Sequence, residues 1–178
     1  MKRALFLLSL LCCIACGQKN DVEPLHVEGT KLVNESGQVV QMKGMSFGWN
    51  CLWPRFYNAG AVKHVIDDWK AEFVRAAVGV ELRASENNSP CYLDDPTFGK
   101  ESACAIVDAA VENGVYVIVD WHAHGLHTAE AVEFFTYMAS KYQGVPNVIY
   151  EIWNEPSYRT ISIRLTTLGQ RSRSILLM

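Results

Sequence analysis

The feature that most constrains this chain is a regular alternation of extended apolar runs with helical patterns. Four extended runs cover residues 42–50, 73–80, 115–119 and 148–153. The last three are apolar at nearly every position, which is typical of parallel strands that are buried on both faces. Between the runs, apolar residues recur at helical spacing in the segments 62–69, 103–111 and 131–142. This order predicts βαβ units, a parallel sheet and an α/β fold.

Turn and cap residues predict where some elements begin and end. Asn113-Gly114 can end the second helix, because glycine readily takes the left-handed conformation of a helix C-cap. Thr128 can cap the N-terminus of the third helix with its hydroxyl. Nearer the N-terminus, turn residues at 34–37 separate two short runs, 30–33 and 38–40, and this pattern predicts a β-hairpin.

Size, composition and charge limit the classes of function. With 178 residues, the chain has room for one domain of ordinary size. It is 49% hydrophobic and 20% charged, which is typical of a globular protein and not of a disordered one. The net charge of −3 argues against a nucleic-acid partner.

The first sixteen residues have the pattern of an export signal. Lys2 and Arg3 precede an apolar stretch at 4–11, which is too short to cross a bilayer as a stable helix. Residues 13–16, Cys-Ile-Ala-Cys, resemble the lipobox of bacterial lipoprotein signal peptides.

We therefore expect a signal peptide at 1–15, lipid attachment at Cys16 and a polar tether at 16–25. The protein would then be exported and anchored to a membrane of the bacterial cell envelope. The alternative is ordinary signal cleavage near Ala15, which would make the protein secreted.

Three cysteines remain after the expected signal and lipidated residue: Cys51, Cys91 and Cys104. An odd and sparse set implies no disulfide framework. A Cys91–Cys104 bridge in an exported protein and buried thiols both stay open as alternatives.

Several polar residues fall at or near the expected strand ends: Arg75, His122, His124, Asn154 and Glu155. Parallel α/β folds build their active sites at the carboxyl ends of the strands. Arg75 is flanked by apolar residues, so it would be buried and would need a charged or hydrogen-bonding partner. Asp120 and Glu151 lie inside apolar strands, and we interpret them as network residues that orient the site. Asp120 shares a strand face with His122, because it lies two residues earlier.

These residues are part of an ordered series of motifs. The motifs are Lys43-Gly44-Met45-Ser46, Asp68-Trp69-Lys70, Val74-Arg75-Ala76-Ala77, Val117-Ile118-Val119-Asp120-Trp121-His122 and Ile149-Tyr150-Glu151-Ile152-Trp153-Asn154-Glu155-Pro156. In this order after successive strands, the set resembles glycoside hydrolase family 5, in its branch of secreted bacterial endo-1,4-β-glucanases. The resemblance runs from about Gly29 to Pro156 and covers the N-terminal half of the family's domain.

The resemblance implies a (β/α)₈ TIM barrel, truncated here to roughly its first four βα units at residues 26–156. It implies internal cleavage of β-1,4-glucan by a retaining mechanism with two glutamates, and we expect no cofactor and no metal. Glu155 matches the general acid/base, and Asn154 matches the residue that hydrogen-bonds the sugar 2-hydroxyl. Arg75 matches the arginine held near the nucleophile, and His122 a histidine that lines the cleavage subsite. His124 resembles an added sugar-binding histidine of this branch.

Elementary chemistry agrees with these roles. A carboxylic acid that protonates a glycosidic oxygen near neutral pH needs a raised pKa, which a partly buried Glu155 could have. Trp49, Trp53 and Tyr57 follow the first strand, where aromatic faces could stack on sugar rings, although an aromatic residue in such a place more often serves packing.

The second carboxylate of a retaining site should lie about 5–5.5 Å from the first. In the family it comes from a strand near the end of the barrel. Residues 157–178 instead hold four Arg, seven Ser or Thr and no Asp or Glu, so we interpret this segment as a non-family tail from a shifted reading frame. The alternative function is therefore a truncated, inactive, lipid-anchored fragment that binds carbohydrate or has no function.

A metal-dependent hydrolase is a third hypothesis, because His122, His124 and His127 follow one strand and paired histidines there can bind zinc. It would leave Asn154-Glu155 unexplained. Within the glycoside hydrolase hypothesis, cellulose, mixed-linkage glucan, xyloglucan and mannan all stay open as substrates.

Overall fold

The computed structural model describes residues 22–82, 88–155 and 176–177. In chain order the elements are β1 (Leu25–Glu28), β2 (Lys31–Asn34), β3 (Gly44–Trp49), the short 3₁₀ helix η1 (Pro54–Phe56), α1 (Ala59–Trp69), β4 (Phe73–Gly79), α2 (Pro96–Glu112), β5 (Tyr116–His122), α3 (Thr128–Lys141), β6 (Val148–Glu151) and β7 (Leu176–Leu177). The expected signal peptide, the lipidation site Cys16, most of the tether and residues 157–175 of the expected tail lie outside the described residues.

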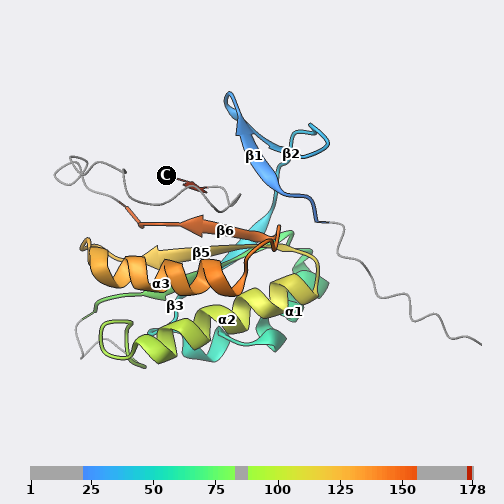
Figure 1. Cartoon of the computed structure of the whole chain (residues 1–178). Coiled ribbons are helices and arrows are strands. Elements are labelled where there is room, and N and C mark those ends of the chain that lie inside the picture. Colours follow the sequence, from blue (N-terminus) through green and yellow to red (C-terminus); the bar gives the residue numbers. More distant parts are fainter. Residues whose placement is uncertain (1–21, 83–87, 156–175, 178) are drawn as a thin grey trace, which may run out of the picture.

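The strands β3, β4, β5, β6 and β7 form one sheet in that order, and every neighbouring pair is parallel. This confirms the predicted parallel sheet with helical crossovers. Figure 1 shows that α1, α2 and α3 all lie on one face of the sheet, while the β1–β2 hairpin lies on the opposite side. The two-residue strand β7 pairs with β6, a contact that the sequence pattern after Pro156 did not predict.

Strand periodicity divides the sheet into two chemically different faces. Val74, Ala76 and Val78 of β4 are fully buried in one hydrophobic core, with the matching alternate residues of β5 and β6. Since the helices cover this face, it excludes water. Successive side chains of a strand point to opposite faces, so Arg75 points away from the helices. The open face of the sheet therefore carries the polar residues, and the covered face carries the core.

The helix ends agree with the sequence in one case and correct it in another. Asn113 is the C-cap of α2, and Gly114 follows with φ +68°, as predicted. Thr128 is not the N-cap of α3. His127 takes that place with φ +39° and makes no side-chain capping bond, so Thr128 is the first helical residue.

The hairpin predicted around residues 34–37 is present, with Asn34 N–H donating to Gln38 O at 3.0 Å and Val40 N–H to Leu32 O at 2.8 Å. A second hairpin, which was not predicted, precedes it. β1 pairs with β2 from Leu25↔Asn34 to Glu28↔Lys31, and the turn lies at Gly29-Thr30. Residues 38–40 add an isolated antiparallel bridge, Val33↔Val39. The Tyr116 hydroxyl donates a hydrogen bond of 2.7 Å to the backbone oxygen of Glu23, so the segment before the hairpin contacts the start of β5.

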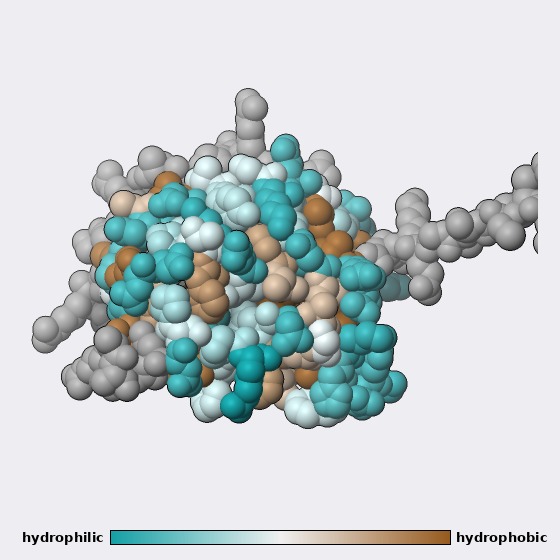
Figure 2. Space-filling view, turned by 90° about the horizontal axis from the view of Figure 1, so that it is seen from below, coloured by the Kyte–Doolittle hydropathy of each residue, from teal (hydrophilic) through white to brown (hydrophobic). Residues whose placement is uncertain are grey.

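Seen from the helix side, most of the surface is hydrophilic or near neutral, and hydrophobic residues appear in separate small groups (Figure 2). One of the exposed hydrophobic residues is Trp69, which was expected on the apolar face of α1 but is 58% exposed. It is the last residue of α1 and packs on the His64 ring, with centroids 6.0 Å apart. In the part of the chain that the structure describes, no helix combines the length and apolarity needed to cross a membrane.

The three cysteines expected in the mature chain are all buried. The structure does not bring Cys91 to Cys104: the Cys91 sulfur lies 2.7 Å from the sulfur of Cys51. Cys104 is in α2, with its sulfur 3.8 Å from the Tyr137 hydroxyl of α3. The sequence could not predict this pairing, because it depends on how two loops meet at the end of the sheet.

Candidate active site

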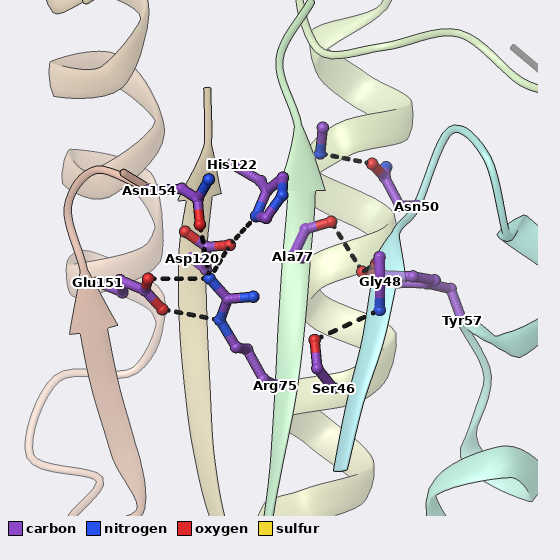
Figure 3. Close-up of polar contacts among 11 residues, drawn as sticks. Ser46, Gly48, Asn50, Tyr57, Arg75, Ala77, Asp120, His122, Glu151 and Asn154 are labelled. Atoms are coloured by element: carbon purple, nitrogen blue, oxygen red, sulfur yellow. Dashed lines mark hydrogen bonds and ion pairs between the residues drawn. The ribbon is translucent and has the colours of Figure 1, made fainter. Parts of the chain in front are cut away.

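Arg75 is the centre of a charged network on the open face of the sheet. Its Nε and Nη2 donate to the two carboxylate oxygens of Glu151, each at 2.8 Å. Nη2 also lies 2.8 Å from Asp120 Oδ2 and 3.2 Å from Asn154 Oδ1. Figure 3 shows the guanidinium between these acceptors, which come from β5, β6 and the loop after β6. The predicted need of Arg75 for a charged partner is thus confirmed, with two carboxylates and an amide.

The strand register explains why these side chains meet. Ala77, Asp120 and Glu151 occupy one level across β4, β5 and β6. Arg75 lies one step lower on the same face, two residues before Ala77. Its long side chain therefore reaches up to the two carboxylates, where a shorter side chain at position 75 would not.

Burial and ion pairing act in opposite directions on the pKa values of Asp120 and Arg75. Asp120 is fully buried, and this burial raises its pKa, although the hydrogen bond with His122 and the charge of Arg75 act to lower it. For Arg75, burial acts to lower the pKa, but hydrogen bonding to Glu151 and the charges of the two carboxylates outweigh it, and the pKa is raised. Arg75 is therefore a permanent cation in contact with two acidic side chains, Asp120 and Glu151.

Asp120 also orients His122. The Nδ1 atom of His122 lies 2.5 Å from Asp120 Oδ2, and the imidazole is mostly buried. A carboxylate at Nδ1 fixes the proton on that nitrogen and leaves Nε2 to face a ligand. Trp49 packs edge-on against the same ring, with centroids 4.6 Å apart, and lies 5.4 Å from the ring of His124. The structure thus brings Trp49, His122 and His124 together as one aromatic group at the carboxyl end of the sheet.

Asn154 and Glu155 lie in the loop directly after β6. The backbone N–H of Asn154 donates to Trp121 O at 3.2 Å, which ties this loop to the end of β5. Asn154 is buried, whereas Glu155 is exposed and has φ +48°. The expectation of a partly buried Glu155 was therefore wrong, because β6 ends at Glu151 and position 155 is already past the strand. A positive φ is strained for a glutamate, and such strain often occurs at functional sites.

Of the other two aromatic residues proposed as sugar platforms, one is exposed and one is not. Trp53 is 43% exposed, with the Arg55 guanidinium 5.5 Å from its ring centroid. Tyr57 is buried, and its hydroxyl lies 2.5 Å from Gly48 O and 2.8 Å from Ala77 O. Burial raises the pKa of this hydroxyl. The proposed sugar-binding role of Tyr57 was wrong: its ring packs in the core, and its hydroxyl binds the backbone of β3 and β4.

Glu81, which the sequence analysis missed, holds the loop between β5 and α3. Its Oε1 accepts hydrogen bonds of 2.8 Å from the backbone N–H groups of His124 and Gly125. Its Oε2 lies 3.3 Å from His127 Nε2. The available signal was an acid placed two residues after the end of β4 (Gly79), at the same edge of the sheet as the other polar residues.

The histidines that suggested a metal-dependent hydrolase have separate partners. His122 contacts Asp120, and His127 contacts Glu81. Within the described ranges, no three His, Cys, Asp or Glu side chains are grouped so that they could hold a metal ion.

Comparison with known families gives one clear match. The family Cellulase (glycosyl hydrolase family 5) matches residues 33–167. Endoglucanase Z of Dickeya dadantii is 41% identical over 151 residues, which cover 82% of this chain and 34% of that protein. Endoglucanase A of Evansella cellulosilytica is 39% identical over 126 residues, which cover 68% of this chain and 24% of that protein.

Solved structures agree with the sequence match. The catalytic domain of Thermobifida fusca endoglucanase Cel5A superposes with a TM-score of 0.66 at 29% identity, covering 76% of this chain and 44% of that domain. A Cytophaga hutchinsonii protein gives a TM-score of 0.70 at 40% identity, covering 77% of this chain and 44% of the other. The chain thus spans about a third or less of the two curated relatives and under half of these solved chains. The β3–β6 sheet with its helices corresponds to part of a (β/α)₈ barrel.

Proposed function

This chain belongs to glycosyl hydrolase family 5, and we propose that it supplies the acid/base half of a site that cleaves β-1,4-glucan internally with retention. Its endoglucanase relatives support this activity. The T. fusca domain has been crystallised with cellotetraose, and that complex supports a β-linked glucan as the substrate class here.

The observation that supports the proposal best is the position of Asn154 between Arg75 and Glu155. Arg75 holds the amide oxygen of Asn154 at 3.2 Å, so the amide nitrogen is the end of that side chain that can donate to a ligand. A hydrogen bond from this nitrogen to the sugar 2-hydroxyl would strengthen in the transition state. The next residue, Glu155, is exposed and can reach the glycosidic oxygen.

In this mechanism Glu155 acts twice. As an acid it gives its proton to the oxygen of the leaving sugar while the second glutamate attacks the anomeric carbon. As a carboxylate it then removes a proton from the water that hydrolyses the glycosyl-enzyme. The second glutamate would come from a later strand of the barrel, as the family resemblance implies.

Arg75 and His122 support this reaction through charge and hydrogen bonding. The guanidinium of Arg75 places a fixed positive charge beside the position expected for the nucleophile, and this charge would keep that glutamate ionised. His122, with Nδ1 bound to Asp120, can offer Nε2 to a sugar hydroxyl. Trp49 and His124 would form the wall against which a neighbouring sugar ring packs.

A barrel-completion experiment tests the assignment of Glu155. Residues 22–155 would be joined to the later half of the barrel of Endoglucanase Z, and hydrolysis of soluble β-glucan would be compared for the parent chimera, Glu155→Gln and Glu101→Gln. Loss of general acid/base catalysis should slow the Glu155→Gln chimera by about 10²–10⁴-fold. Glu101, an exposed carboxylate in α2, is the matched control and should leave the rate unchanged.

A second substrate separates an acid/base role from a structural one. In an aryl cellobioside with an acidic phenol, the phenolate leaves without needing protonation. Glu155→Gln should therefore slow formation of the glycosyl-enzyme from this substrate far less than it slows β-glucan hydrolysis. A Glu155→Gln chimera that hydrolyses β-glucan at the parental rate would show that the acid/base assignment is wrong.

A further inference from the structure

Two buried cysteines meet at the end of the sheet that carries the site. Cys51 follows β3 by two residues, and Cys91 lies in the connection between β4 and α2. Both are fully buried, and the Cys91 thiol donates to the Cys51 sulfur at 2.7 Å. They are 40 positions apart in the sequence, so only the fold brings them together.

We propose that Cys51 and Cys91 form a disulfide that crosslinks the β3–α1 loop to the β4–α2 connection and holds Trp49 in place at the wall of the site. The crosslink itself does not depend on the proposed function. Its effect on Trp49 rests on that function, because Trp49 contacts both His122 and His124 in the proposed sugar site.

The backbone around the two cysteines already joins the same two segments. The N–H groups of Asn88 and Ser89 donate to Cys51 O at 2.9 and 3.0 Å. The Asn88 side chain donates to Leu52 O at 2.8 Å. Because a disulfide needs sulfurs about 2.0 Å apart and the loops are already bonded to each other, a small movement of the two side chains completes it.

Gly79, the last residue of β4, connects the cysteines to the site. A Cβ atom at position 79 would lie 2.6 Å from Cys51 Sγ and 2.9 Å from Trp49 Cε3. Both side chains therefore pack on the glycine backbone, side by side. A crosslink that fixes Cys51 leaves Trp49 less room to move away from His122.

The chemistry requires an oxidant of the disulfide class. One cysteine thiolate attacks the oxidant's S–S bond, forms a mixed disulfide and releases a first thiol. The second cysteine then attacks the protein sulfur of that mixed disulfide and releases a second thiol. The oxidant thus takes up two electrons and two protons, and the protein loses two hydrogens. The alternative partner, Cys104, lies in α2 with its sulfur 3.8 Å from the Tyr137 hydroxyl of α3.

Burial determines when this exchange can occur. It raises the pKa of the Cys51 thiol, so the thiolate that exchange requires is scarce once the chain has folded. We therefore expect the bond to form during folding, and to resist reductants afterwards unless a denaturant opens the fold.

The test uses the full chain, refolded either with oxidised glutathione or with reduced glutathione. Each sample is alkylated in denaturant and digested, and the peptides are identified by mass. The expected result after oxidative refolding is a crosslinked peptide that contains Cys51 and Cys91, lighter by two hydrogens, with Cys104 alkylated. Cys104→Ser is the matched control and should give the same crosslink. Alkylation of both Cys51 and Cys91, or a peptide that joins Cys91 to Cys104, would overturn the proposal.

Hydrogen exchange tests the consequence for Trp49 without any carbohydrate. Deuterium uptake of the peptide around residues 46–53 should be several-fold slower in the oxidised chain than in the reduced one. Equal uptake in the two forms, with the crosslink present, would overturn the role at Trp49. The thermal midpoint should also be higher in the oxidised form, and Cys104→Ser should retain that difference.

Discussion

Arg75 and Glu151 form a two-point ion pair, in which Nε and Nη2 of the arginine each lie 2.8 Å from one oxygen of the carboxylate. The residues are 76 positions apart and come from β4 and β6, with β5 between them. Two parallel hydrogen bonds fix the plane of the guanidinium as well as its position. The remaining contacts of Nη2, to Asp120 and Asn154, depend on this orientation.

Replacement of Arg75 should destabilise the fold as well as the site. Arg75→Ala leaves the buried carboxylate of Asp120 and the partly buried carboxylate of Glu151 without their cation, and breaking such contacts lowers the free energy of unfolding by up to about 3–5 kcal/mol. Arg75→Lys keeps the charge but cannot make the two-point contact, so we expect a smaller loss. Denaturant unfolding of the full chain measures the free energy of unfolding of both variants and of the parent.

Arg55→Ala is the matched control for these variants. Arg55 is exposed, and its contacts are with the Trp53 and Phe56 rings, so its removal should change the unfolding free energy by less than about 1 kcal/mol. If Arg75→Ala is as stable as Arg55→Ala, the network does not contribute to stability in the way its geometry indicates.

The buried carboxylate of Asp120 should give a distinct pH dependence of stability. Its pKa is raised in the folded state from an ordinary value of 3.8, so the folded chain binds this proton more tightly than the unfolded chain. The stabilisation is therefore complete below about pH 4 and is lost as the pH rises through the folded pKa. We predict that the unfolding free energy of the parent, minus that of Asp120→Asn, falls as the pH increases above 4.

The same subtraction with Asp68→Asn provides the control. Asp68 lies on α1, and its side chain is 60% exposed. It contacts His64 at the surface, so a fall with pH that both differences share would not be assigned to the burial of Asp120. A parent–Asp120→Asn difference that rises with pH would mean that Arg75 and His122 dominate over burial at Asp120.

The parallel sheet and the polar character of its open end could be predicted from the sequence, because strand and helix periodicities are local properties of the chain. Arg75 inside an apolar strand required a buried partner wherever the strand was placed, and Asp120 and Glu151 had the same requirement. The sequence did not show that Arg75, Asp120 and Glu151 are one another's partners. That depends on the register Ala77↔Asp120↔Glu151 across three strands.

The loops were predicted less well, since their conformation depends on contacts from distant segments. Tyr57 was expected to face sugar, but its hydroxyl contacts Gly48 O and Ala77 O in the core. Glu155 is exposed because β6 ends four residues earlier, at Glu151. The Cys51–Cys91 contact depends on the meeting of two loops that no periodicity specifies.

The expected lipid anchor can be tested in cells. We predict that Cys16→Ser releases the protein from the membrane fraction, because the thiol of Cys16 is the proposed attachment point. Cys12→Ser, inside the expected signal peptide, should leave the protein membrane-bound. A Cys16→Ser variant that sediments with membranes as firmly as the parent would rule out the lipoprotein hypothesis.

The last prediction concerns Glu81 and the loop that presents His124. Glu81→Ala would leave the N–H groups of His124 and Gly125 without their acceptor, and each unsatisfied donor costs about 1–3 kcal/mol if it stays buried. The loop should therefore open toward water, and hydrogen exchange across residues 122–128 should accelerate. The expected change is local, since β4 and β5 keep their full register.

Glu81→Gln separates the hydrogen bonds from the charge. Its amide oxygen can still accept from both N–H groups, so exchange in the loop should stay close to that of the parent, while the ion pair with His127 is lost. If Glu81→Gln and Glu81→Ala accelerate exchange equally, it is the charge on Glu81, and not its acceptor oxygen, that holds His124 beside Trp49.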